Sequence, residues 1–324
     1  MTSVVQLEAA DWDTELEATG SPFRFSHRAA AGEALEAAYP SYRHQPCRVD
    51  YDDGGSLLFP LVRIERRLKA LTIVAGMPLG LEGTPVVRSG RATAAHLQAL
   101  FDALGACGRL ELHGGTSGSP PEIGMTTAGS THVLDLTLGF DAIWNNSFSA
   151  KTRNMCRKAE RGGLSVAMDC STDAITAYAS LYRLSAVGWG YREPPYPDAL
   201  FEMLLATDHA ELWVARVDGE IVAGAVMLLG SEDLMYWSGA MNRDFRHVAP
   251  SNAIIRAVVE TACARNLSYL DFGASSGLSG VEAFKRSFGA QPREYRSISL
   301  STWRYRHLER LGRAGARVRE KTIS

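Results

Sequence analysis

Two stretches of the sequence repeat one pattern, and this repeat constrains the fold more than any other feature. Residues 106–114 read Ala-Cys-Gly-Arg-Leu-Glu-Leu-His-Gly, and residues 262–273 read Ala-Cys-Ala-Arg-Asn-Leu-Ser-Tyr-Leu-Asp-Phe-Gly. Each stretch begins within the end of an apolar helical segment, 92–106 or 252–265, and contains a short apolar run typical of a strand. Because internal self-similarity accompanies repeated structure, the pattern predicts a duplicated α/β unit.

Strand patterns precede the helix in both halves. In the first half the apolar runs 56–64 and 71–75 are joined by a charged turn. Three strands are expected in the second half, at 211–217, 221–229 and 234–240. Asp218-Gly219 lies between the first two of these, and this dipeptide predicts a tight hairpin. The expected fold class is therefore α+β with a mixed sheet.

The length and composition suit a two-domain globular protein. With 324 residues the chain can bury a sizeable core, and no apolar run approaches the roughly 18 residues of a membrane span. Residues 1–13 contain three acidic residues and no basic residue, unlike a secretory signal. The five widely spaced cysteines include no Cys-x-x-Cys pair, and the eight histidines have no metal-site spacing. We expect a cytoplasmic protein with reduced thiols and no bound metal.

Positive charge is concentrated in two segments, although the whole chain has a net charge of −2. Residues 151–161 contain five basic residues and one acidic residue, and residues 304–321 contain seven basic and two acidic residues. A charge run is commonly a solvated helix face, but this asymmetry also suits an anionic partner.

The stretch 268–289 contains the strongest candidate for chemistry. A predicted strand carrying Asp271 leads into a loop of small residues, and a helix follows that carries Lys285. Charged residues are costly in a buried strand or on an inward helix face unless they are paired or handle a charged group. Asp271 and Lys285 are either a structural pair or part of a site. The first half has a loop in place of this helix, so any catalytic site is expected in the second half.

The order of predicted elements from 173 to 300 resembles the GNAT acyltransferase fold. Ser149-Ala-Lys-Thr-Arg-Asn-Met-Cys-Arg-Lys-Ala-Glu-Arg-Gly-Gly-Leu and Ala283-Phe-Lys-Arg-Ser-Phe-Gly-Ala are similar to segments of Fem-type (FemABX) aminoacyltransferases and of their bacterial relatives with two GNAT units. The resemblance implies two tandem GNAT-like units at 1–140 and 141–302, followed by a basic C-terminal segment at 303–324. The long heptad run of a coiled-coil arm, found in some Fem enzymes, is absent from the sequence.

The resemblance implies amide formation by direct transfer of an acyl group to an amine. Fem-type enzymes take the group from aminoacyl-tRNA, and GNAT enzymes generally take it from a CoA thioester, so either molecule is the expected co-substrate, with no permanently bound cofactor. The family's Phe-Lys pair corresponds to Phe284 and Lys285, and Phe284 is expected to bind the donor. Lys285 would serve the oxyanion or the 3′ end of the donor, and Asp271 would accept a proton from the amine.

The loop before the long helix differs from the pattern of CoA-dependent enzymes. CoA-dependent GNAT enzymes carry Gln/Arg-x-x-Gly-x-Gly/Ala at this place, where backbone N–H groups bind pyrophosphate. Here the segment reads Arg246-His-Val-Ala-Pro-Ser-Asn, in which Pro250 has no N–H. The departure favours aminoacyl-tRNA over acyl-CoA, with Arg246, Ser251 and Asn252 expected to bind the donor.

The remaining expected contacts follow from the tRNA hypothesis. Lys151, Arg153 and Arg157 of the first basic segment would bind tRNA phosphates near the acceptor stem. The acceptor amine, on a peptidoglycan precursor or a natural-product intermediate, would bind near an aromatic and proline-rich loop. The residues expected there are Trp189, Tyr191, Arg192 and Trp237.

Two rival classes remain open. Gly273-Ala-Ser275-Ser-Gly277 matches the Gly-x-Ser-x-Gly pattern of serine hydrolases, although no Asp follows Ser275 and the only later histidine is His307. A non-catalytic protein that binds RNA or another partner is the other alternative. We expect an acyltransferase.

Overall fold

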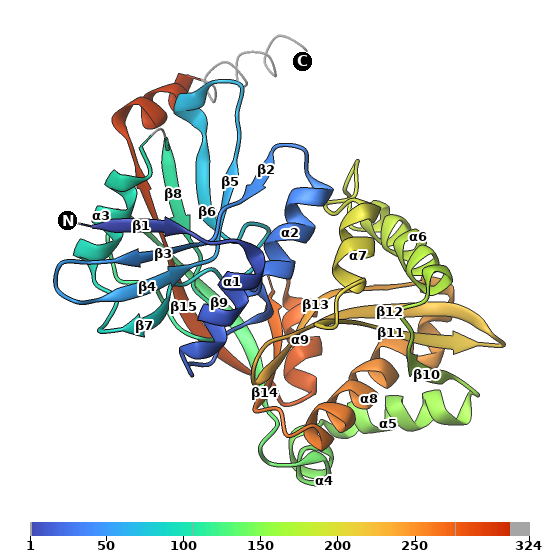
Figure 1. The fold of residues 1–324 in the computed structure, drawn as a ribbon. Helices are drawn as coiled ribbons and strands as arrows, with labels where there is room; N and C mark the ends of the chain where they lie inside the picture. The colour runs from blue at the N-terminus through green and yellow to red at the C-terminus, as the bar shows by residue number, and fades with distance from the viewer. Residues whose placement is uncertain (1, 106, 276, 312–324) are drawn as a thin grey trace. The chain divides into compact units, whose positions relative to one another are not determined.

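A computed structural model describes residues 2–105, 107–275 and 277–311 (Figure 1). These residues form two compact units. Unit 1 comprises the described parts of Met1–Gly129 and Tyr295–Ser324, and unit 2 comprises Ser130–Glu294. The division differs from the consecutive ranges expected from the sequence, because the chain returns to unit 1 after unit 2.

Unit 1 contains two sheets. Its elements are β1 (Ser3–Gln6), α1 (Ala9–Ala18), η1 (Phe25–His27), α2 (Ala29–Ala38), β2 (Tyr42–His44), β3 (Cys47–Asp50), β4 (Ser56–Phe59), β5 (Leu61–Ile64), η2 (Lys69–Leu71), β6 (Ile73–Gly76), β7 (Val86–Ser89), α3 (Ala94–Ala103) and β8 (Arg109–Leu112). One sheet has the order β1-β3-β4-β7. The other has the order β15-β8-β6-β5-β2 within this unit, where β15 is Gln291–Ser301. Helix 303–311 follows β15.

Unit 2 contains the larger part of the predicted acyltransferase pattern. Its elements are the end of β9 (Met125–Asp135), α4 (Phe140–Ala142), the π-helical turn η3 (Ile143–Ser147), α5 (Ala150–Arg161), β10 (Ser165–Met168), α6 (Thr172–Gly188), α7 (Asp198–Leu205), β11 (Ala210–Val217), β12 (Glu220–Leu229), β13 (Asp233–Met241), η4 (Arg243–Val248), α8 (Pro250–Ala264), β14 (Tyr269–Ala274) and α9 (Ser279–Ser287). The strand order is β10-β11-β12-β13-β14-β9.

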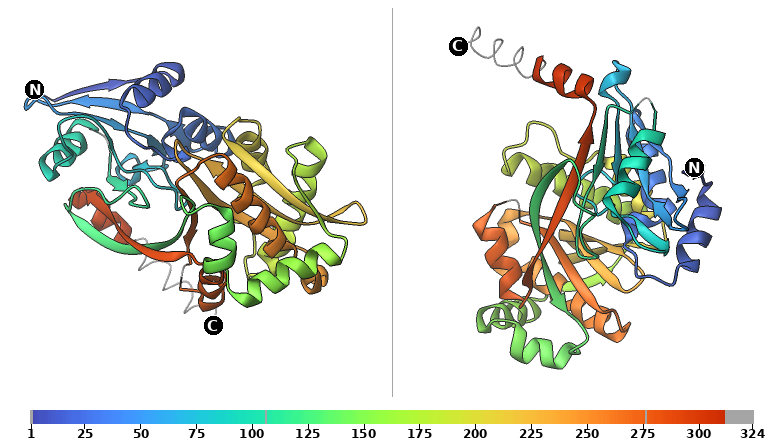
Figure 2. Two further views of the ribbon diagram at one scale, coloured as in Figure 1. Left: turned by 90° about the horizontal axis from the view of Figure 1, so that it is seen from below. Right: turned by 90° about the vertical axis from the view of Figure 1, so that its left-hand side faces the viewer.

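Helices cover both faces of the unit 2 sheet. Helices α6 and α7 pack on one face, and α5 and α8 lie on the other, as Figure 1 and the view from below in Figure 2 show. Strand β12 is buried on both faces, which explains its continuous apolar sequence from 221 to 229. Ile254, Val258 and Ala262 recur along α8 and fill the core beneath the sheet.

The predicted hairpin and the predicted repeat are both present. Asp218 and Gly219 have φ values of 50° and 85°, the left-handed pair that a two-residue type I′ turn requires, and they join β11 to β12. In unit 1, α3 connects β6 to its parallel neighbour β8, and in unit 2, α8 connects β13 to its parallel neighbour β14. The α+β fold with two GNAT-like units is thereby confirmed.

The two copies differ where the parallel strands end. In unit 1 the loop after β6 lies directly over the end of that strand, because a Cβ on Gly83 would come within 1.6 Å of the Gly76 carbonyl oxygen. The Gly83 N–H also donates a hydrogen bond of 2.9 Å to the carbonyl of His113, just beyond β8. The loop therefore packs against the ends of both β6 and β8 in unit 1.

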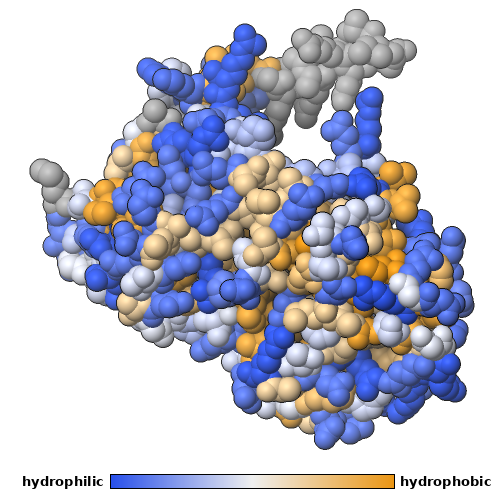
Figure 3. Space-filling view, turned by 45° about the vertical axis from the view of Figure 1, so that its right-hand side comes forward, coloured by the Kyte–Doolittle hydropathy of each residue, from blue (hydrophilic) through white to orange (hydrophobic). Residues whose placement is uncertain are grey.

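The described residues form neither a membrane-spanning helix nor a metal-binding cluster. No helix in the described part of the chain combines the length and apolar character needed to cross a bilayer. Hydrophilic residues cover most of the face seen in Figure 3. Among the described residues, no three His, Cys, Asp or Glu side chains gather in a metal-binding arrangement.

Candidate functional site

Strands β13 and β14 separate part-way along their length. They pair only from Asp233 to Met235 on β13 and from Tyr269 to Asp271 on β14, whereas β13 continues for six more residues. Beyond this point β13 also carries a β-bulge at Trp237, since the register against β12 shifts there. Beyond this point the facing edges of β13 and β14 are no longer paired with each other.

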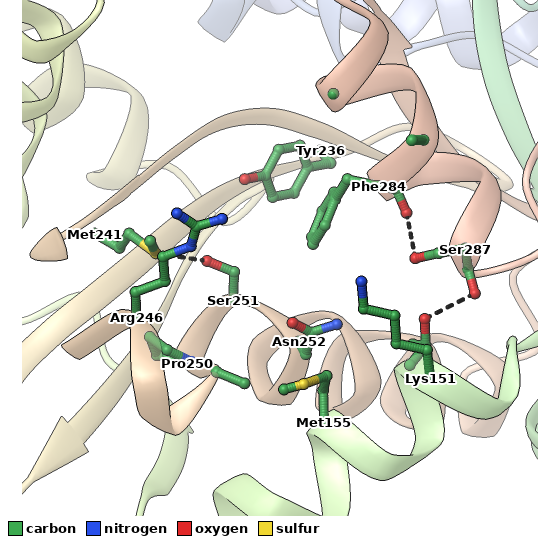
Figure 4. A pocket seen from close by; sticks show the side chains of 14 residues that line it. Lys151, Met155, Tyr236, Met241, Arg246, Pro250, Ser251, Asn252, Phe284 and Ser287 are labelled. Carbon is green, nitrogen blue, oxygen red and sulfur yellow. Dashed lines mark hydrogen bonds between the residues drawn. The ribbon is translucent and has the colours of Figure 1, made fainter.

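A cavity of about 580 Å³ lies beside this separation, within the usual range for a ligand site (Figure 4). Its lining comes from α5, β13, η4, the start of α8, and α9. The lining residues are Lys151, Thr152, Met155, Tyr236, Met241, Arg246, Ala249, Pro250, Ser251, Asn252, Gly280, Ala283, Phe284 and Ser287. We call this space the donor cavity. Five of the seven residues expected to bind the donor line it: Lys151, Arg246, Ser251, Asn252 and Phe284.

The donor cavity combines positive charge with a planar apolar wall. Lys151 and Arg246 are exposed, and neither has an ion-pair partner among the described residues. Phe284 and Tyr236 supply aromatic surface on the other side, as Figure 4 shows. Such a cavity suits a ligand that carries both an anionic group and a flat ring, because arginine and lysine bind phosphate and aromatic faces stack on bases.

The start of α8 offers few free backbone donors. Ala249 adopts a left-handed conformation at φ 55°, and Pro250 at the first helical position has no N–H. The N–H groups of Asn252 and Ala253 donate to the Ala249 carbonyl at 3.1 and 3.3 Å. The helix start is therefore a poorer phosphate cradle than a glycine-rich turn, and side chains must supply most of the contacts with an anion.

Tyr236 occupies the cavity wall because Gly239 leaves room for it. A Cβ on Gly239 would lie 1.7 Å from the Tyr236 hydroxyl, so only glycine fits beneath this ring. Burial raises the pKa of Tyr236 to about 12, and the hydroxyl therefore stays protonated at neutral pH as a hydrogen-bond donor. Tyr236 was not predicted as a site residue from the sequence, although a glycine inside a strand indicates close approach by another group.

Lys285 and Asp271 lie together, but neither lines the donor cavity. Lys285 follows Phe284 on α9, and one residue turns a helix by about 100°, so its side chain leaves from a different face. Only 3% of Lys285 is exposed, and its ammonium group donates to the carbonyls of Gly273 at 2.7 Å and Ala274 at 2.8 Å. It thus holds the end of β14, just beyond the place where β14 leaves β13.

Asp271 is held by the same segment. It is 4% exposed and accepts hydrogen bonds from the Gly273 N–H at 2.8 Å and from the Thr131 hydroxyl. Burial lowers the pKa of Lys285 to about 8, and the charge of Asp271 offsets part of this effect. In this structure Lys285 and Asp271 both form hydrogen bonds with backbone groups at the end of β14.

A buried histidine completes this cluster and was missed from the sequence. His132 is buried, and neither ring nitrogen has a hydrogen-bond partner among the described residues. Burial lowers its pKa, and the positive charge of Lys285 adds to the effect, while Glu282 lies 3.9 Å away and opposes it. The ring is therefore neutral near pH 7. A lone histidine in an apolar strand gives no local signal of such a neighbourhood.

The other two residues expected to bind tRNA have local partners. Arg153 donates to the carbonyls of Trp144 at 3.2 Å, Asn145 at 3.1 Å and Phe148 at 2.5 Å, and so caps the end of η3. Arg157 lies 5.6 Å from the centre of the Trp144 ring. Neither residue lines the donor cavity.

The residues expected to bind the acceptor lie around α6 and α7, outside the donor cavity. Trp189, Tyr191 and Arg192 are exposed beyond the end of α6. Trp237, at the bulge of β13, stacks on Tyr196 with ring centres 4.6 Å apart. Its indole N–H is buried and has no hydrogen-bond partner among the described residues.

The serine hydrolase alternative lacks the geometry that it needs. The Ser275 hydroxyl is buried and has no hydrogen-bond partner within the described part of the chain. A serine nucleophile requires a base within hydrogen-bond reach, commonly a histidine. The Gly-x-Ser-x-Gly match is therefore a feature of the loop between β14 and α9.

Comparisons with known proteins agree with this fold. Residues 146–286 match the acetyltransferase (GNAT) domain family. FemX has a TM-score of 0.69 and 13% identity, over 95% of this chain and 99% of its own. A tandem GNAT protein from the clavulanic acid biosynthesis pathway has a TM-score of 0.54 and 12% identity, over 93% and 98%.

A third solved structure is similar over a comparable length. It is the C-terminal domain of a candidate lysylphosphatidylglycerol synthetase from Agrobacterium fabrum, with a TM-score of 0.56 and 13% identity, over 94% of this chain and 95% of its own. No curated protein matches the sequence. The matched domain and the shared fold show that the chain contains a GNAT acyltransferase domain, at residues 146–286, within a FemABX-like fold.

Proposed function

We propose that this acyltransferase moves an aminoacyl group from aminoacyl-tRNA to an amine acceptor. The observation that carries the proposal is the composition of the donor cavity. It presents two cations, Lys151 and Arg246, that have no ion-pair partner among the described residues, and aromatic rings from Phe284 and Tyr236. These lie next to a helix start that Pro250 leaves short of backbone donors. Side-chain cations and stacking rings suit the phosphates and terminal base of an RNA 3′ end.

In the proposed reaction the acceptor nitrogen attacks the ester carbonyl carbon of the donor. A C–N bond forms, the tetrahedral oxyanion collapses, and the ester C–O bond breaks, so that the terminal ribose oxygen leaves and takes up a proton. The nitrogen loses one proton in the same process, and this proton restores the hydroxyl group that protonates the leaving oxygen. We assign the proton for the leaving oxygen to the Tyr236 hydroxyl, because it is protonated at neutral pH and lines the donor cavity.

Lys285 and Asp271 have positioning roles in this proposal. The Lys285 ammonium group reaches two backbone carbonyls of β14, and Asp271 fixes the Gly273 N–H in the same segment. Both residues therefore set the course of the strand that borders the opening. The direct oxyanion role expected for Lys285 would require its ammonium group to leave these carbonyls.

The acceptor is an amine on a peptidoglycan precursor or a natural-product intermediate. We place it near Trp189, Tyr191, Arg192 and Trp237, because Trp237 belongs to the same strand as Tyr236 and extends from its bulge. The unpartnered indole N–H of Trp237 supplies a donor for a polar group of the acceptor.

Acyl-CoA is the second candidate donor. The match to the acetyltransferase (GNAT) domain family favours it, since GNAT enzymes generally use CoA thioesters. Loss of backbone donors at Pro250 disfavours it. The two hypotheses predict different binding of tRNA and of acetyl-CoA to the protein.

The test is binding of bulk aminoacylated tRNA to the purified protein at low and moderate salt, with acetyl-CoA as competitor. We expect salt-sensitive binding that acetyl-CoA does not displace, and weaker binding by the Lys151→Gln/Arg246→Gln variant. Binding of acetyl-CoA without binding of tRNA would overturn the aminoacyl-tRNA proposal and assign the donor cavity to a CoA thioester.

A further inference from the structure

Unit 1 contains a second cavity, of about 510 Å³, at the end of β15. Its lining comes from α3, β8, the start of β9, β15 and helix 303–311, which Figure 1 shows in red after β15. The wall contains three arginines, namely Arg109, Arg306 and Arg310. Phe101 and Leu300 supply apolar surface. We call this space the unit 1 cavity.

Close backbone packing and a hydrogen bond fix the walls of the unit 1 cavity. Gly124 has φ 67°, and a Cβ there would lie 2.4 Å from the Ser299 carbonyl oxygen, so the chain before β9 must pass directly against β15. Arg306 donates to the Ser301 carbonyl at 3.0 Å, which fixes this guanidinium at the cavity wall. Ser299 is buried, and its hydroxyl has no hydrogen-bond partner among the described residues.

Positive charge exceeds negative charge in the lining. Arg109 is held between Glu111 at 2.8 Å and Glu309 at 3.7 Å, so these carboxylates balance its charge. Arg306 and Arg310 stand one helical turn apart, are exposed, and have no carboxylate partner within the described part of unit 1. Two such guanidinium groups match the several oxygens of a phosphate, which arginine binds in a forked geometry.

We propose that the unit 1 cavity binds a phosphate-bearing nucleotide, either free or within an RNA strand. Arg306 and Arg310 hold the phosphate, and Phe101 and Leu300 contact the base. The cavity volume exceeds the need of a phosphate alone, and the apolar wall accounts for the remainder. This assignment does not require the donor to be aminoacyl-tRNA, because all of its residues belong to unit 1.

The test measures AMP binding by equilibrium dialysis in the Lys151→Gln/Arg246→Gln background, which lacks the cations of the donor cavity. We expect AMP to bind this protein, adenosine to bind far more weakly, and Arg306→Gln/Arg310→Gln to weaken AMP binding by about tenfold or more. The single variant Arg310→Gln should weaken it in the same direction with an unchanged melting temperature. Arg67→Gln, which removes an exposed arginine of unit 1 outside the cavity, is the matched control.

The proposal fails if AMP does not bind in this background, if adenosine binds equally well, or if the Arg306→Gln/Arg310→Gln variant binds AMP normally. A second measurement identifies the source of the nucleotide. If the ligand is RNA, the same two substitutions lower the slope of tRNA affinity against salt by about one unit for each arginine. An unchanged slope together with lost AMP binding assigns the unit 1 cavity to a free nucleotide.

Discussion

The Lys285 ammonium group donates a 2.7 Å hydrogen bond to the carbonyl oxygen of Gly273. Gly273 lies two residues beyond the last pair that joins β14 to β13. The bond therefore ties α9 to β14 where the sheet opens beside the donor cavity. The sequence indicated Lys285 as a candidate catalytic residue. In this structure its ammonium group instead binds the backbone of the strand next to the donor cavity.

Replacement of Lys285 by methionine should destabilise the protein. The substitution leaves the carbonyls of Gly273 and Ala274 without their donor in a buried place, and we expect a loss of about 2 kcal/mol in the free energy of unfolding. Urea denaturation at pH 7 measures this loss. Arg286→Met on the exposed side of α9 is the control and should change stability little. Full stability combined with lost transfer would instead show that Lys285 acts on the substrate.

The contribution of Lys285 to stability should rise between pH 8 and pH 10.5. Its pKa is lowered from 10.5 to about 8 in the folded protein, so in this range the unfolded chain binds the proton that the folded protein has released. The difference in unfolding free energy between the wild type and Lys285→Met should therefore increase with pH, by at most about 1.4 kcal/mol for each pH unit. The neutral amine still has two N–H groups for its two carbonyls. A difference that stays constant across this range contradicts the lowered pKa.

Replacement of Gly239 by alanine should displace the Tyr236 ring. The added methyl group would meet the Tyr236 hydroxyl at 1.7 Å, and we expect donor affinity to fall about tenfold as the ring is pushed into the donor cavity. Binding measurements on Gly239→Ala, Tyr236→Ala and the double variant test this directly. In the Tyr236→Ala background, Gly239→Ala should change donor affinity little, because the effects of substitutions at residues in contact are not additive. Additive effects would show that Gly239 acts without Tyr236.

Removal of the donor-cavity cations should reduce the salt dependence of tRNA binding. Lys151→Gln and Arg246→Gln should each lower the slope of log affinity against log salt by about one unit, because one phosphate contact is lost in each case. Lys158→Gln is the matched control, since Lys158 is an exposed lysine on the same helix as Lys151 and does not line the donor cavity. Equal slopes in Lys151→Gln and Lys158→Gln would place the RNA elsewhere.

Local patterns were sufficient to predict the type of most elements. Asp218-Gly219 has the backbone chemistry of a hairpin, and the apolar spacing along 252–265 allows only a helix that packs on one side. Strand 56–64 was predicted as one element, but Pro60 divides it into β4 and β5, and these belong to different sheets. Which sheet a strand joins depends on partners that are distant in sequence.

The sequence by itself determined the duplicated α/β plan, the GNAT-like order of elements, and five of the residues that line the donor cavity. Only the tertiary structure decided which face of α9 borders that cavity, so Phe284 lines it while the adjacent Lys285 is buried behind β14. It also brought Tyr236 over Gly239 and placed His132 beside Glu282. The physical reason is that propensity and periodicity act over a few residues, whereas a site is made of side chains that meet only when separate elements pack.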